Sequence, residues 1–109
     1  MTVEKLFEIV DGTKKNEICD DVKLRWVADV EGRALCEIHG KSPSEVTLPT
    51  NGDDVLAIPD PYSGIYMLYL VAMIEFVAGN YLAYSSLSAE FEKSLERYAK
   101  AVLRNCARQ

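Results

Sequence analysis

Side chains that could act as nucleophiles, general bases or metal ligands are few in this sequence and far apart. The only histidine, His39, lies next to Gly40, where an imidazole interacts favourably with the carbonyl groups at a helix end. The cysteines Cys19, Cys36 and Cys106 form no Cys-x-x-Cys pair. They indicate neither a zinc site nor a disulfide framework, and they are typical of a protein in a reducing cytoplasm.

Two pairs of neighbouring carboxylates, Asp20-Asp21 and Asp53-Asp54, are the other groups that could do chemistry. The first pair is typical of a helix cap and the second of a turn. The run from Asn51 to Asp54 lacks the spacing of a calcium-binding loop, and the sequence contains neither a Gly-x-Ser-x-Gly motif nor a glycine-rich phosphate loop. We therefore expect no enzymatic activity, no cofactor and no metal ion.

Length and composition indicate one folded domain over residues 1–109. Hydrophobic residues make up 49% of the chain and charged residues 27%, which is typical of globular proteins. The net charge of −5 disfavours general binding to nucleic acid, which needs a basic surface. This charge is unevenly distributed: residues 1–61 hold 13 acidic and 7 basic residues, a net −6, whereas residues 62–109 hold 4 acidic and 5 basic residues, a net +1.

The spacing of apolar residues predicts an all-α fold, a small bundle of about four helices. Apolar residues recur every three or four positions, and glycine or capping residues flank these stretches, so we expect helices over residues 2–11, 20–39, 62–78 and 81–105. The third is different in kind, because ten consecutive residues from Ile65 to Ile74 are apolar or aromatic. A helix without a polar face is buried on all sides, so we place it at the centre of the bundle.

This apolar run does not predict a membrane helix. It ends at Ala78, is interrupted by Glu75, and is too short to cross a bilayer. The first residues, Met-Thr-Val-Glu-Lys-Leu, lack the long apolar core of a signal peptide. We therefore expect a protein that is soluble and does not bind membranes.

Residues 41–61 form a proline-rich arm between the second and third predicted helices. It contains all four prolines, and Glu45–Leu48 and Val55–Ile58 could form a short hairpin around Asn51-Gly52. Two interpretations stay open: a loop or hairpin over its own core, or an arm that reaches a neighbouring subunit. In the second case the contacts would come from Val46, Leu48, Leu56 and Ile58.

Two further groups of residues are candidates for a binding interface. Tyr62, Tyr66 and Tyr69 share one face of the third predicted helix, where tyrosines serve either in the core, with bonded hydroxyls, or in an interface. A basic stripe on the last helix could stabilise its C-terminus or dock an acidic partner such as the first half of another copy. Direct contact with DNA is a weaker third interpretation of this stripe, which consists of Arg97, Lys100, Arg104 and Arg108.

Several short motifs occur in the order and spacing of a known family. They are Val22-Lys-Leu-Arg-Trp26, Pro61-Tyr62-Ser-Gly-Ile-Tyr66, Tyr69-Leu-Val-Ala-Met-Ile-Glu75, and Gly79-Asn-Tyr81 followed by Tyr84. Over residues 2–104 the chain resembles the small head–tail connector (adaptor) proteins of long-tailed phages and prophages of Gram-positive bacteria. It departs from the family pattern at Ser63-Gly64 and Asn80, where acidic residues are usual.

This resemblance implies a non-enzymatic virion assembly protein. Such a subunit forms a homo-oligomeric ring beneath the portal and links the head to the tail. Its partners would be further copies of itself, the portal and the neck or tail proteins, but neither a specific nucleic-acid sequence nor a membrane. Before assembly the subunit would be either a monomer or an oligomer. We expect it in the cytoplasm of the bacterial host during assembly and then in the virion neck.

A different class of function is the alternative. The chain could be a small helical module that binds one protein partner, or a regulator, without a role in a virion. A DNA-binding regulator is disfavoured by the net charge of −5.

Overall fold

The computed structural model describes the backbone of residues 1–108 and the side chains of residues 1–106. Within this part of the chain there are helices but no β-strands, which confirms the predicted all-α class. A π-helical turn, Ala34–Ile38, continues the second helix, and a single 3-10 turn, Pro43–Glu45, follows it. The four α-helices are α1 (Val3–Thr13), α2 (Asp20–Arg33), α3 (Gly64–Val77) and α4 (Tyr81–Arg108).

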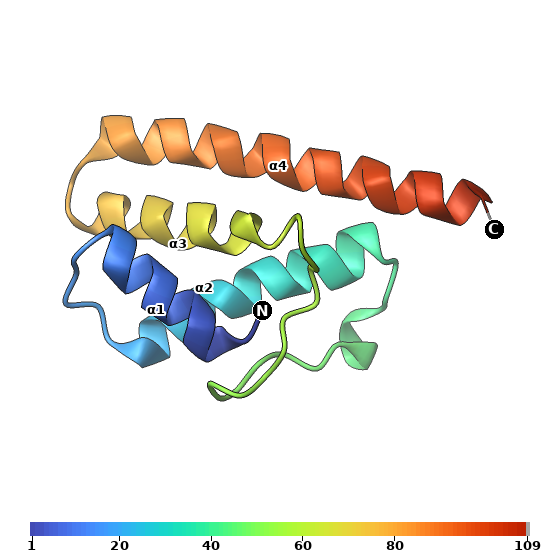
Figure 1. Cartoon of the computed structure of the whole chain (residues 1–109), viewed down its shortest axis with the longest axis horizontal. Coiled ribbons are helices and arrows are strands. Elements are labelled where there is room, and N and C mark those ends of the chain that lie inside the picture. Colours follow the sequence, from blue (N-terminus) through green and yellow to red (C-terminus); the bar gives the residue numbers. More distant parts are fainter. Residues whose placement is uncertain (109) are drawn as a thin grey trace.

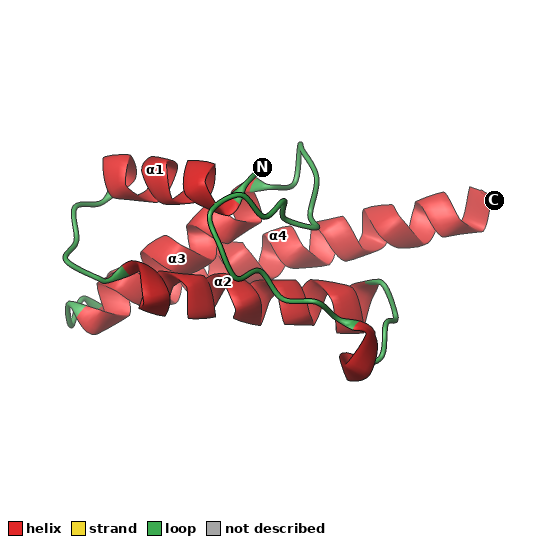
Figure 2. Cartoon of the chain, turned by 90° about the horizontal axis from the view of Figure 1, so that it is seen from below, coloured by secondary structure: helices red, strands yellow, loops and turns green. Residues whose placement is uncertain are grey.

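The apolar helix α3 lies at the centre of the bundle, as predicted. It runs antiparallel to α4 on one side, while α1 and α2 pack against it on the other, so it contacts each of the other three helices (Figure 1). The core between them is built from fully buried side chains such as Leu6, Val27, Val30 and Leu70. The C-terminal end of α4 extends beyond all other elements (Figures 1 and 2).

A tight turn at Gly79 joins α3 to α4. Gly79 has a positive φ of 83°, a conformation that glycine adopts without steric cost. The Gly79 amide donates to the Phe76 carbonyl at 3.1 Å, and the Asn80 amide donates to the Glu75 carbonyl at 2.9 Å. These two bonds satisfy carbonyl groups that the end of α3 leaves without helical partners. The two helices predicted over residues 62–78 and 81–105 are therefore separated at this turn, as their ranges imply.

The connecting segment, residues 41–61, packs against the start of α1. Thr2 caps this helix, with its hydroxyl accepting the Lys5 amide at 3.3 Å. Two further amides of the first turn donate to the connecting segment: Val3 to the Asp54 carbonyl at 3.1 Å and Glu4 to the Gly52 carbonyl at 3.0 Å. The segment thus supplies acceptors for amides that a helix start cannot satisfy internally. Figure 2 shows it crossing the molecule to reach the N-terminus.

The suggested hairpin within residues 41–61 is not observed. Only an isolated antiparallel bridge between Thr2 and Val55 occurs in the part of the chain that the structure describes. The Leu56 amide donates to the Met1 carbonyl at 2.9 Å, so the second half of the segment pairs with the N-terminus instead of with the first half. A close approach at Gly52 supports this arrangement, because a Cβ atom there would lie 3.3 Å from the Glu4 Cβ.

Candidate protein interaction site

The connecting segment buries part of the predicted interface in the chain's own core. Leu56 and Ile58 are 4% and 0% exposed, so neither side chain is accessible to a second subunit. Of the two interpretations left open for this segment, the burial of these two side chains supports the loop over its own core and contradicts a contact of Leu56 and Ile58 with a neighbouring subunit. Val46 is half-buried and Leu48 is 43% exposed, so only this first half of the segment presents apolar side chains at the surface.

A buried carboxylate holds the second half of the connecting segment in place. Glu31 of α2 is 4% exposed and accepts two hydrogen bonds, one from the Tyr66 hydroxyl and one from the Ala57 amide at 3.0 Å. The Tyr66 hydroxyl in turn accepts the Ile58 amide at 2.8 Å. Four polar groups from three elements are therefore satisfied within one network, as buried polar groups require.

The position of Tyr66 excludes it from an interface in this conformation. Its side chain is completely buried, and burial, followed by the hydrogen bond to Glu31, raises the pKa of its hydroxyl far above the usual value. The hydroxyl therefore stays protonated and donates to Glu31. Sequence reasoning missed Glu31, although it lies four residues after Val27 and three before Ala34, both of which are buried. Its position on the apolar face of the helix could have indicated a buried carboxylate.

The other two tyrosines of the predicted face contact α4. The ring of Tyr62 lies 5.3 Å from that of Tyr98, and the ring of Tyr69 lies 5.0 Å from that of Phe91. Both are half-buried, so they contribute to the α3–α4 contact and keep part of their surface accessible. The Tyr98 hydroxyl is also hydrogen-bonded to His39 Nε2 at 2.7 Å. That contact gives the single histidine a structural partner at the end of the π-helical turn.

The predicted basic stripe is exposed where the structure describes it. Arg97, Lys100 and Arg104 lie on the surface of α4, and the Arg108 side chain lies outside the described residues. Lys100 Nζ lies 3.3 Å from Glu96 Oε1, an exposed pair one turn apart on the helix. Near the start of α3, Arg97 and Tyr62 both line a groove of about 370 Å³, so the structure brings these two predicted residues together.

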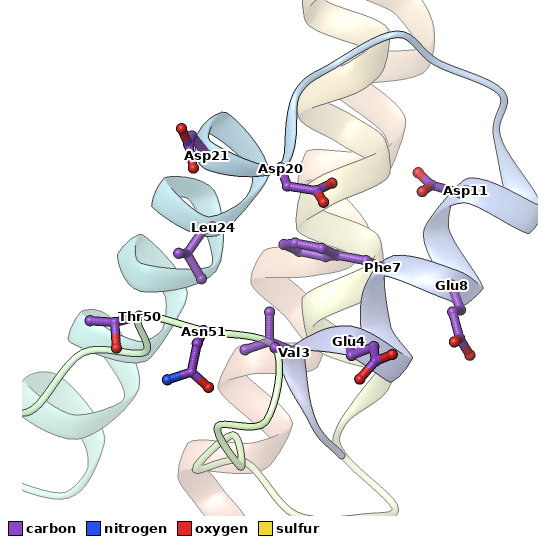
Figure 3. A pocket seen from close by; sticks show the side chains of 11 residues that line it. Val3, Glu4, Phe7, Glu8, Asp11, Asp20, Asp21, Leu24, Thr50 and Asn51 are labelled. Atoms are coloured by element: carbon purple, nitrogen blue, oxygen red, sulfur yellow. The ribbon is translucent and has the colours of Figure 1, made fainter.

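A pocket of about 420 Å³ lies between α1, the start of α2 and the connecting segment. Figure 3 shows its lining, with the ring of Phe7 at the centre and Leu24 opposite. The apolar side chains are Val3, Phe7 and Leu24, the carboxylates are Glu4, Glu8, Asp11, Asp20 and Asp21, and the connecting segment contributes Thr50, Asn51 and Gly52. We refer to this cavity as the acidic pocket.

Only one carboxylate of the acidic pocket is neutralised within the described side chains. Lys23 Nζ lies 2.6 Å from Asp11 Oδ1, and this hydrogen bond lowers the pKa of the Asp11 carboxyl. The other four, Glu4, Glu8, Asp20 and Asp21, take part in no ion pair in residues 1–106. An apolar floor inside a negative rim suits a ligand that carries both an apolar group and positive charge.

A group of exposed apolar side chains lies at the turn between α3 and α4. Phe76, Val77, Tyr81 and Leu82 are all exposed there, and Leu82 is 89% exposed. The Phe76 ring lies 5.7 Å from the Tyr81 ring and 5.0 Å from the Tyr84 ring. The sequence analysis placed the whole apolar helix in the core, whereas in the structure its last residues, Phe76 and Val77, are exposed at the turn that joins α3 to α4.

No family model, curated protein or solved structure matches this chain. Among the described side chains, no group of three or more His, Cys, Asp or Glu residues is placed to hold a metal ion. Along residues 1–108, none of the helices has both the length and the apolar character needed to cross a bilayer.

Proposed function

We propose that this chain is a structural subunit of a phage particle, a head–tail connector that assembles with further copies of itself beneath the portal. The resemblance of its motifs over residues 2–104 to small connector proteins supports this function. In this role the protein performs no catalysis; its partners are the portal on one side and neck or tail proteins on the other.

One observation carries the proposal: the chain presents complementary surfaces that lie apart. The acidic pocket is formed by α1, the start of α2 and the connecting segment, whereas Lys100 and Arg104 are exposed in the C-terminal part of α4, the helix whose end projects beyond the other elements (Figure 1). Surfaces of opposite charge that cannot meet within one chain favour head-to-tail contacts between identical chains. Contacts of this kind close into rings when the rotation between subunits allows it.

The experiment that tests this function is removal of the gene from the phage or prophage that carries it. We expect heads that package DNA and then lose it, together with unattached tails, in electron micrographs of the lysate. A plasmid that expresses the intact chain should restore complete virions. Normal virions in the deletion strain would refute the proposal and would favour a helical module without a role in the particle.

A matched variant separates an assembly defect from a folding defect. Leu82→Ser alters a side chain that is 89% exposed, so the fold is expected to keep its stability. The plasmid-borne variant can therefore be compared with the intact chain in the deletion strain. A loss of complete virions with this soluble, folded variant would assign the α3–α4 turn to contacts with another virion protein.

A further inference from the structure

We infer that the C-terminal end of α4 in one copy docks into the acidic pocket of the next copy. The docking element consists of Lys100, Leu103 and Arg104, which we call the basic end of α4. This inference rests on the proposed self-assembly and adds the two surfaces through which it occurs. The pocket would bind an apolar side chain together with two cations that lie beside it on the same helix, contributed by a second copy of this chain.

Among the described side chains, Arg104 of the basic end takes part in no ion pair, and Lys100 pairs only with the exposed Glu96 one turn earlier on the same helix. Leu103 is 70% exposed and Arg104 is also at the surface, and both belong to the last two turns of α4, whose C-terminal end extends beyond the other elements (Figures 1 and 2). Lys100 lies three residues before Leu103, so the two share one face of the helix. An exposed leucine on a projecting helix is a suitable anchor for an interface, because its burial removes apolar surface from water.

The acidic pocket has the complementary chemistry. Phe7 and Leu24 provide apolar contact area, and both are only partly buried, so the cavity of about 420 Å³ exposes part of their surface. Glu8 of α1 and Asp20 of α2 lie on different sides of the Phe7 ring (Figure 3). A leucine seated on this floor would bring Lys100 and Arg104, which lie one turn apart beside it on the helix, toward the negative rim of the pocket. Charge complementarity of this kind sets the orientation and the specificity of an interface.

The geometry makes the contact heterologous. The pocket and the basic end of α4 are different surfaces, so each copy would use its pocket for one neighbour and its helix for the other. Two native cysteines report on such a contact: Cys19 immediately precedes Asp20, and Cys106 lies one helical turn after Leu103, and both are exposed. Head-to-tail docking therefore predicts cross-links between Cys19 of one copy and Cys106 of the next.

The first experiment uses concentrated Cys36→Ser protein, which keeps only these two cysteines, and a short bismaleimide cross-linker. We expect a ladder of dimers, trimers and larger species, with Cys19–Cys106 peptides identified by mass spectrometry. Dimers joined only through two Cys106 or two Cys19 residues would overturn the inference, because they indicate a symmetric contact. The absence of any cross-linked species at high protein concentration would overturn it as well.

A charge-swap experiment provides the second test. In the same background, Lys100→Glu/Arg104→Glu and Glu8→Lys/Asp20→Lys are each expected to lower the cross-linked fraction about tenfold, because like charges then face each other. Mixing the two variants should restore the ladder, since each then meets a surface of opposite charge. Circular dichroism of each variant checks that it is folded.

Failure of this inference is distinguishable from failure of the proposed function. A ladder that neither variant weakens, or that mixing does not restore, would refute docking through these surfaces. Tailless particles in the deletion strain would at the same time leave the connector function standing. Conversely, normal virions in the deletion strain would refute that function whatever the cross-linking shows.

Discussion

Tyr66→Phe provides the sharpest test of how the connecting segment is held in the fold. The substitution removes one oxygen atom and keeps the buried ring. That oxygen donates to the Glu31 carboxylate and accepts the Ile58 amide at 2.8 Å. Without it, a buried carboxylate loses one of its two donors and the Ile58 amide loses its acceptor.

The magnitude follows from these two losses. A hydrogen bond to a charged group contributes about 1.5–3 kcal/mol, and a buried donor left without a partner costs about 1–3 kcal/mol. Both losses involve the same hydroxyl, so they do not simply add. We expect the free energy of unfolding to fall by about 3 kcal/mol, a large part of the roughly 5–15 kcal/mol that holds a domain folded.

Urea unfolding followed by circular dichroism measures this loss. With a slope of about 1–3 kcal/mol per molar urea, the midpoint should fall by roughly 1–3 M. Tyr69→Phe is the matched control on the same helix, because its hydroxyl lies 3.5 Å from Asp29 Oδ2 at the surface and should contribute less than about 0.5 kcal/mol. Equal effects of the two substitutions, or a loss below about 0.5 kcal/mol for Tyr66→Phe, would refute the reasoning.

Three further predictions concern charge and exposure. The Lys23 ammonium lowers the pKa of Asp11, so this pair stabilises the fold fully above the unfolded carboxyl pKa of about 3.9 and less as the pH falls through the folded pKa. The difference in the free energy of unfolding between the intact chain and Lys23→Met should therefore change between about pH 5 and pH 2 in urea titrations. A difference that stays constant over this range would contradict the prediction. Arg33→Ala, which removes hydrogen bonds of 2.9 and 3.2 Å to Glu92, should cost only about 1 kcal/mol in the same assay, because both side chains are partly exposed; a cost above about 3 kcal/mol would show that this estimate is wrong. Leu82→Ser should change the free energy of unfolding by less than about 0.5 kcal/mol, and a larger loss would mean that the α3–α4 turn is packed.

Features that depend on neighbours along the chain could be predicted from the sequence. The four helices follow from apolar spacing, the start of α1 from the Thr2 cap, and the α3–α4 break from Gly79, whose positive φ other residues adopt at a cost. The central position of α3 follows from its lack of a polar face. The helices, the cap and the break are decided by interactions within a few residues, and the place of α3 by the composition of a single segment.

Features that depend on distant partners could not be predicted in the same way. The sequence left open whether Leu56 and Ile58 pack on their own core or contact a second subunit. In the structure the amides of this stretch bond to Met1, Glu31 and Tyr66, and the two side chains complete the core. Periodicity does not show which chain an extended segment will pack against. The acidic pocket was also not foreseen, because its carboxylates come from two helices that meet only in the folded chain.

The sequence by itself determined the helical class, the order of the elements and the basic face of the last helix, because local spacing dictates which side chains share a helix face. Only the tertiary structure decided that Glu31 and Tyr66 bind the connecting segment to its own core. It also decided that five carboxylates surround one apolar floor while the basic end of α4 projects elsewhere. The physical reason is that burial and charge proximity are properties of pairs of elements, and only their packing brings those pairs together.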